Sequence, residues 1–192
     1  DVVETGIGRS GVVAVIHGRT PGRGIGLRAD MDALPIFEAT GLVHASTVPG
    51  KMHACGHDGH TAMGLAAAKY LAMSRDFAGR AVMIFQPAEE DGGGARAMIA
   101  DGLMDRFGVD EVYGLHNIPG MDVGAFATRL GPIMAAADMF RIVLTGRGGH
   151  AAQPHLALDT TMIAGQVLVA LQSIVARNVD PLKPAVLTVA TL

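Results

Sequence analysis

The densest set of side chains able to bind a metal ion lies in the run from Met52 to His60, which reads M-H-A-C-G-H-D-G-H. His53, Cys55 and His57 stand two residues apart, so in an extended segment they point the same way. Thiolate and imidazole are ligands that zinc and similar divalent ions prefer. Taken alone, the run fits a polar loop with one buried thiol equally well. The polar residues elsewhere in the chain therefore decide between the two interpretations.

Four carboxylates and a further imidazole lie at or just past the ends of three predicted strands, which end near residues 28, 86 and 117. These residues are Asp30, Asp32, Glu89, Glu90 and His116. In an open α/β sheet the carboxyl ends of the strands meet at a crevice where ligands bind. Each residue alone also fits an ordinary turn or strand end. Together they predict oxygen donors beside nitrogen and sulfur donors, which is what a two-metal hydrolase needs.

The composition is that of a folded protein and argues against several classes of partner. Hydrophobic residues make up 49% of the 192 residues and charged residues 17%, which favours a packed core over disorder. The net charge of −3 gives no electrostatic case for nucleic acid or an anionic membrane as partner. No uninterrupted run of apolar residues is long enough to span a bilayer. The run Gly92–Gly94 lacks the G-K-[ST] of a phosphate loop and follows acidic residues, so we reject a nucleotide site there.

Cys55 is the only cysteine, which rules out an intramolecular disulfide and fits a reducing compartment such as the cytoplasm. No signal peptide is visible. The chain begins at Asp1 without Met, in the middle of a pattern, and stops inside a predicted strand. Both ends are therefore expected to be cut.

Alternating strand and helix patterns predict an α/β sheet with both faces covered. The predicted strands are 11–18, 24–28, 80–86, 111–117 and 123–128, and the predicted helices are 59–73 and 95–100. We expect the first two strands to form a hairpin or a neighbouring pair. Asp58 is expected to cap the helix that follows it.

After Gly131-Pro132 the pattern changes to a strand over 139–145, a glycine-rich loop over 146–155 and a helix over 159–177. A closing strand is expected over 185–192. The helix has one apolar stripe, and the strands could form a small separate sheet. We therefore predict a domain boundary near residues 131–137.

Five motifs, in this order along the chain, resemble the M20 metallopeptidase family. They are R-A-D-M-D-A-L-P (28–35), M-H-A-C-G-H-D-G-H-T-A-M (52–63), F-Q-P-A-E-E (85–90), G-L-H-N (114–117) and G-R-G-G-H-A-A-Q-P-H (146–155). The motifs are most similar to the branch of hippurate hydrolases, N-acyl-amino-acid amidohydrolases and plant auxin-conjugate hydrolases. The resemblance covers essentially the whole chain.

The resemblance implies an α/β fold with two parts, each incomplete. Residues 1–134 would belong to a zinc-peptidase-like catalytic domain, and residues 135–192 to a small α+β lid domain that forms a homodimer. The family also has a first strand and helix, and a further metal-binding histidine near its C-terminus, which are absent here. Residues 1–192 alone are therefore expected to be inactive.

The resemblance also implies a role for individual residues. Four are implied ligands of two divalent metal ions, which could be zinc, manganese, cobalt or nickel: Cys55, His57, Glu90 and His116. Glu89 is the implied general base, and Asp32 supports the site from behind the ligands. His150 would reach an active site from the small domain, in many relatives that of the partner subunit. Asn178 would lie near the substrate, although Asn also suits the end of a helix.

The implied reaction is hydrolysis of the amide bond of N-acyl amino acids such as hippurate, with metal-activated water attacking the carbonyl and Glu89 as general base. N-acetyl-diaminopimelate deacetylases and auxin-conjugate hydrolases share these motifs and are alternatives within the enzyme class. A different class of protein is a truncated, non-catalytic remnant that keeps metal binding and dimerisation.

Overall fold

The computed structural model describes residues 1–90 and 92–192 and divides into two compact units, Asp1–Ala125 and Phe126–Leu192. The predicted boundary at residues 134 and 135 lies later in the chain. The roles assigned above to the two parts stay predictions. Each unit is described by itself.

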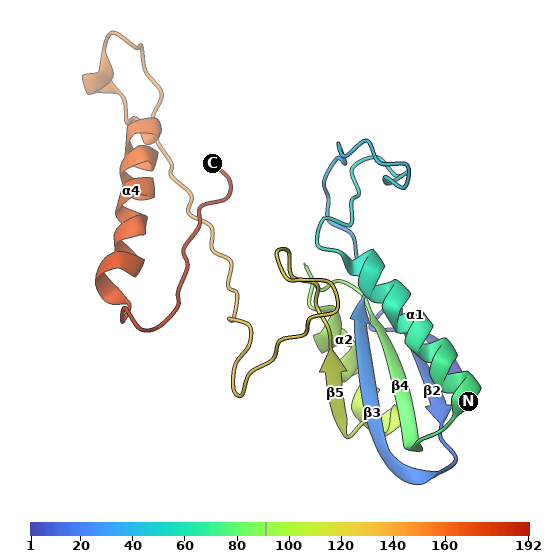
Figure 1. Cartoon of the computed structure of the whole chain (residues 1–192). Coiled ribbons are helices and arrows are strands. Elements are labelled where there is room, and N and C mark those ends of the chain that lie inside the picture. Colours follow the sequence, from blue (N-terminus) through green and yellow to red (C-terminus); the bar gives the residue numbers. More distant parts are fainter. Residues whose placement is uncertain (91) are drawn as a thin grey trace. The chain divides into compact units, whose positions relative to one another are not determined.

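The first unit is built on a five-stranded sheet in the order β1-β2-β4-β3-β5. The strands are β1 (Val2–Ile7), β2 (Gly11–His17), β3 (Thr20–Asp30), β4 (Ala78–Gln86) and β5 (Glu111–Gly114). The central strand β4 is antiparallel to β2 and parallel to β3, and β5 is parallel to β3. Because β3, β4 and β5 run in the same direction, their carboxyl ends lie at the same end of the sheet (Figure 1).

Helices cover both faces of this sheet. Helix α1 (His57–Ser74) packs on one face, while α2 (Gly94–Ala100) and α3 (Leu103–Phe107) pack on the other (Figure 1). Side chains of β4 alternate between the two faces: Val82 and Ile84 join the core with α2 and α3, and Met83 and Phe85 join the core with α1. The prediction of a buried strand over 80–86 is confirmed, and its continuous apolar run follows from burial on both faces.

Met98 on α2 is fully buried against the sheet, so its substitution provides a test of this packing. A Cβ on Gly8 would lie 2.8 Å from the backbone nitrogen of Met98, so only glycine permits this approach. We expect Met98→Ala to lower the free energy of unfolding by about 2–5 kcal/mol, measured by urea denaturation, because it leaves a cavity. Ile99→Ala is the matched control, since Ile99 is 56% exposed. Equal effects from the two substitutions would contradict the packing described.

The prediction that strands 11–18 and 24–28 pair with each other is wrong, because β4 lies between them. The glycine-rich start of β3 crosses the beginning of β4 instead. A Cβ on Gly22 would lie 2.8 Å from the backbone nitrogen of Gly79, so the two main chains pass each other closely. This crossing gives β4 a hydrogen-bonded neighbour on each side.

Three further details of the first unit differ from the sequence predictions. Asp58 is not the cap of α1: the helix begins at His57, and the cap position is Gly56, with φ of 83°. Strand β5 ends at Gly114, so His116 lies in the loop beyond the strand. The edge strand β1 was not predicted, and it pairs antiparallel with β2.

In the second unit, helix α4 (Thr160–Asn178) is capped by Asp159, whose carboxylate accepts from the backbone N–H of Thr161 at 2.8 Å. A short 3₁₀ turn, η1 (Pro154–Leu156), precedes it. By length and its mean hydropathy of 1.2, α4 is apolar enough to cross a membrane, a test that core helices of water-soluble proteins also pass.

The strands predicted over 123–128, 139–145 and 185–192 are not present in the part of the chain that the structure describes. There, from residue 126 onward, pairing is limited to one isolated bridge between Arg147 and Leu158. A β-prone segment becomes a strand only where a second segment satisfies its backbone groups. The structure of these residues therefore does not contain the expected small sheet.

Candidate metal centre

The carboxyl ends of the three parallel strands and the start of α1 together carry the residues of a candidate metal centre. Asp30 is the last residue of β3, and Asp32 follows it. Glu89 and Glu90 follow β4, and His116 follows β5. The parallel order of β3, β4 and β5 thus gathers side chains that are far apart in the sequence.

Two groups of potential ligands share His57. The ligand atoms of Cys55, His57 and His116 all lie within 4.8 Å of one another, and so do those of His57, Glu89 and Glu90. The structure therefore brings together the four predicted metal ligands and the predicted general base. Their roles remain predictions.

The hydrogen bonds of His57 leave one of its ring nitrogens available for a metal ion. Its ring is 1% exposed, and Nδ1 lies 3.0 Å from the backbone oxygen of Asp32 and 3.2 Å from its carboxylate. Both partners can only accept from an imidazole, so Nδ1 carries the hydrogen. Nε2 then presents a lone pair, and it is buried without a hydrogen-bond partner. A carboxylate behind a histidine in this way is the usual support of a metal ligand.

The distances between the donor atoms also fit a metal ion. Sγ of Cys55 lies 3.5 Å from Nε2 of His116. A tetrahedral zinc ion bonded to sulfur at about 2.3 Å and to nitrogen at about 2.0–2.1 Å holds those atoms about 3.5 Å apart. Oε1 of Glu90 lies 3.8 Å from Nε2 of His57, close to the spacing of two ligands on one ion. The residues present therefore fit the divalent ions implied by the sequence.

Asp32 contacts both His57 and the loop that carries Glu90. Its carboxylate contacts Nδ1 of His57 and accepts from the backbone N–H of Glu90 at 3.1 Å. Partial burial by itself raises the pKa of Asp32, but the backbone groups of Glu90 and Glu89 and the nearby His57 together lower it below its ordinary 3.8. A carboxylate held in its ionised form is suited to orient His57.

Cys55 has a protonated thiol when no metal ion is bound. Burial, the hydrogen bond to Glu90 and the negative charges of Glu90, Glu89 and Asp30 raise the pKa of this thiol from 9.0 to about 11. The negative charges of these carboxylates disfavour a free thiolate, and the same charges attract a cation. Metal binding must therefore release the thiol proton.

This proton release predicts how metal affinity depends on pH. Below the thiol pKa, each pH unit gained should tighten binding about tenfold through Cys55 alone. In Cys55→Ser, metal binding should be weaker, and it should release about one proton fewer than in the unmodified protein. Calorimetric titration with Zn²⁺ at neutral and mildly alkaline pH, in two buffers of different ionisation enthalpy, measures the protons released. An identical proton count for both proteins would show that the thiol does not bind the ion.

Asp30, one of the carboxylates expected at this end of the sheet, and His60, for which no role was predicted, belong to the same site. With His57 they form a third, fully buried group of potential ligands. His60 follows His57 by three residues, which places it one turn later on the same face of α1, and that spacing was visible in the sequence. His53 is in none of the three groups found among the described residues. The segment from His53 to His57 is not extended, because the backbone N–H of Gly56 donates to the oxygen of His53 at 3.3 Å in a turn and α1 begins at His57.

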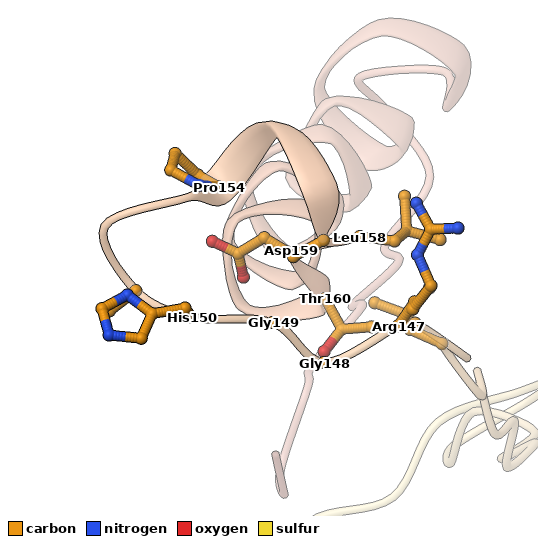
Figure 2. Close-up of a pocket in the computed structure, with 12 residues that line it drawn as sticks. Arg147, Gly148, Gly149, His150, Pro154, Leu158, Asp159 and Thr160 are labelled. Atoms are coloured by element: carbon orange, nitrogen blue, oxygen red, sulfur yellow. The ribbon is translucent and has the colours of Figure 1, made fainter.

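His150 and Asn178 lie in the second unit. Figure 2 shows His150 on the loop that precedes α4, at a concave region of about 610 Å³ that Arg147, Pro154 and Asp159 also line. Nδ1 of His150 accepts from the backbone N–H of Ala152 at 3.1 Å, which leaves Nε2 as a potential donor. Asn178 is the last residue of α4, and the cap position is Val179. Their predicted roles remain predictions.

Comparison with known proteins identifies relatives over nearly the whole chain. The chain is 51% identical to the N-acetyl-L-cysteine deacetylase of Bacillus subtilis, over 96% of this chain and 44% of that protein. It is 50% identical to the hippurate hydrolase of Campylobacter jejuni, over 95% of this chain and 48% of that protein. The chain thus spans about half the length of these relatives.

A solved structure from Bacillus subtilis, described as a dinuclear metal-binding peptidase of the M20 family, matches with a TM-score of 0.60 and 45% identity. The match covers 64% of this chain and 35% of that one. The model of peptidase family M20/M25/M40 matches residues 26–189, which include the whole candidate metal centre. This chain therefore belongs to the peptidase family M20/M25/M40.

Proposed function

We propose that this chain is part of a metal-dependent amidohydrolase that cuts the amide bond of N-acyl amino acids such as hippurate. One observation carries the proposal: the buried Nε2 of His57, which has no hydrogen-bond partner and lies among a thiol, further imidazoles and three carboxylates, with Oδ2 of Asp30 at 3.7 Å. The names of the relatives, which include a hippurate hydrolase and an N-acetyl-L-cysteine deacetylase, support this substrate class. A thiol ligand must stay reduced, so we also propose a cytoplasmic location.

In this proposal Cys55, His57, Glu90 and His116 hold up to two divalent ions. When bound, such ions lower the pKa of water to about 7 and polarise the substrate carbonyl. Asp32 keeps the hydrogen of His57 on Nδ1, so that Nε2 would have a lone pair to offer a metal ion. We base the dinuclear arrangement on the related structure, and the metal identity on the mixed donor set, which suits zinc, manganese, cobalt or nickel.

In this proposal Glu89 transfers protons. It is exposed to solvent and lies beside Glu90 in the group that surrounds His57. Its carboxylate would take a proton from the attacking water and deliver it to the leaving nitrogen, which completes the hydrolysis. His150 would donate from Nε2 to the developing oxyanion, Asn178 would contact the substrate, and the second unit would form a homodimer.

The test is hydrolysis of benzoyl-glycine by the full-length protein that contains this chain. We expect release of glycine that stops when a chelator removes the metal and resumes when Zn²⁺ or Mn²⁺ is restored. Parallel assays with N-acetyl-cysteine, N-acetyl-diaminopimelate and an indole-acetyl amino acid identify the preferred acyl and amino-acid groups. A chelator-insensitive enzyme, or a metal-loaded protein inactive on all four substrates, would contradict the proposal.

A further inference from the structure

A chain of hydrogen bonds, the first of them buried, connects Asp30 to the loop that carries His116. Asp30 is fully buried and His60 is 3% exposed, and Nδ1 of His60 lies 2.6 Å from Oδ1 of Asp30. Arg28 lies 2.8 Å from the other oxygen, Oδ2, and supplies a compensating charge without hydrogen-bond geometry. A buried carboxylate beside an arginine accepts hydrogen bonds, so Nδ1 of His60 donates.

The second ring nitrogen of His60 is engaged as well. Nε2 accepts from the backbone N–H of Asn117 at 3.0 Å. A backbone N–H can only donate, so Nε2 must present a lone pair. The two partners together select one neutral tautomer of His60. Because both nitrogens are used, His60 is not available as a metal ligand in this arrangement.

The main chain of Asn117 also fixes the tautomer of His116. The carbonyl oxygen of Asn117 accepts from Nδ1 of His116 at 2.7 Å, which leaves a lone pair on Nε2 of His116. That nitrogen is the one that lies 3.5 Å from Sγ of Cys55. The loop also packs against the turn between Cys55 and His57, where a Cβ on Gly56 would lie 2.5 Å from the side-chain oxygen of Asn117.

We infer that His60 is a positioning residue: oriented by Asp30, it holds the main chain of Asn117 and thereby sets His116 against Cys55 for metal binding. The inference rests on the metal centre of the proposed function. It assigns a task to two buried residues that the proposed mechanism does not use. Groups that orient a metal ligand in this way typically change metal affinity about 10–100-fold when they are removed.

Two substitutions at one position separate the two hydrogen bonds of His60. In His60→Gln the side-chain oxygen can reach the place of Nε2 and accept from Asn117. In His60→Asn the amide nitrogen can reach the place of Nδ1 and donate to Asp30, but the side chain is too short for Asn117. Titration of the full-length protein with Co²⁺, followed by cobalt–thiolate absorption, should show affinity lowered about 10–100-fold in His60→Asn and largely kept in His60→Gln. Equal losses in the two variants, or no loss in His60→Asn, would overturn the inference.

Thr61→Val is the matched control for a general loss of stability. The hydroxyl of Thr61, the next residue on α1, donates to the backbone oxygen of Asp30 at 3.0 Å and does not contact Asn117. Its removal should lower the unfolding temperature yet leave Co²⁺ affinity unchanged. If Thr61→Val weakened Co²⁺ binding as much as His60→Asn, the effect would be one of stability, and the positioning role would be wrong.

The tautomer of His60 provides a test that needs no substitution. In ¹⁵N-labelled unmodified protein, the imidazole correlations of His60 should show a proton on Nδ1 and none on Nε2. A proton on Nε2 would overturn the inference. If the unmodified protein bound no Co²⁺, the proposed function would fail, whereas normal Co²⁺ binding with unaltered affinity in His60→Asn would defeat the inference alone.

Discussion

Glu89→Gln in the full-length protein is expected to lower turnover of benzoyl-glycine about 10²–10⁴-fold while the bound metal is retained. Glu89 lies beside the proposed ligand Glu90, but its proposed task is proton transfer, which a neutral amide cannot perform. The side chain keeps its size and polarity, so the metal centre should keep its structure. Steady-state kinetics together with metal analysis of the same sample measure both quantities.

Glu90→Gln is the matched comparison, because it makes the same chemical change one residue along the chain. Its carboxylate lies 3.8 Å from Nε2 of His57, so this variant should lose metal as well as turnover. The contrast tests whether these two neighbouring residues of the loop after β4 have different tasks. Near-normal turnover in Glu89→Gln would show that another group is the base.

His150→Ala should lower the turnover of the full-length protein about 10²–10³-fold, the usual effect of losing one donor to an oxyanion. Nε2 of His150 is free to donate because Nδ1 accepts from Ala152. Metal content should not change, since His150 is in none of the groups of potential ligands among the described residues. A loss of metal in His150→Ala would contradict this separation of roles.

Mixing two inactive variants tests whether His150 serves the partner subunit of the proposed homodimer. In a mixed dimer of His150→Ala and Glu89→Gln, exchange between subunits would leave one site with both groups intact. Part of the activity should then return. If His150 serves its own subunit, every site in the mixture lacks one group and no activity returns. Subunit exchange must be verified separately, by mass labelling of one variant.

Local sequence patterns were sufficient to predict the helices and strands whose conformation depends little on the segments that they pack against. The run over 80–86 is apolar on both faces, which only a central strand or a buried helix accommodates, and it is β4. The helices near residues 59–73 and 159–177 were predicted within about two residues, because helix hydrogen bonds are local. The gathering of polar residues at one sheet edge followed from the alternation of strands and helices, which favours parallel pairing.

Pairing and hydrogen-bond partners were decided by the tertiary structure. The strand order β2-β4-β3 depends on a close crossing of Gly22 and Gly79, which are far apart in the sequence.

The sequence by itself determined which residue types surround the candidate metal centre, because the proposed ligands His57 and His116 lie in motifs that resemble those of the family. It did not determine which nitrogen of each ring faces the ion, since Asp32 and the main chain of Asn117 make that choice through contacts formed only on folding. For the same reason His60 had no predicted role: a histidine on a helix face acquires one only when a buried carboxylate and a backbone N–H from distant segments occupy its two nitrogens.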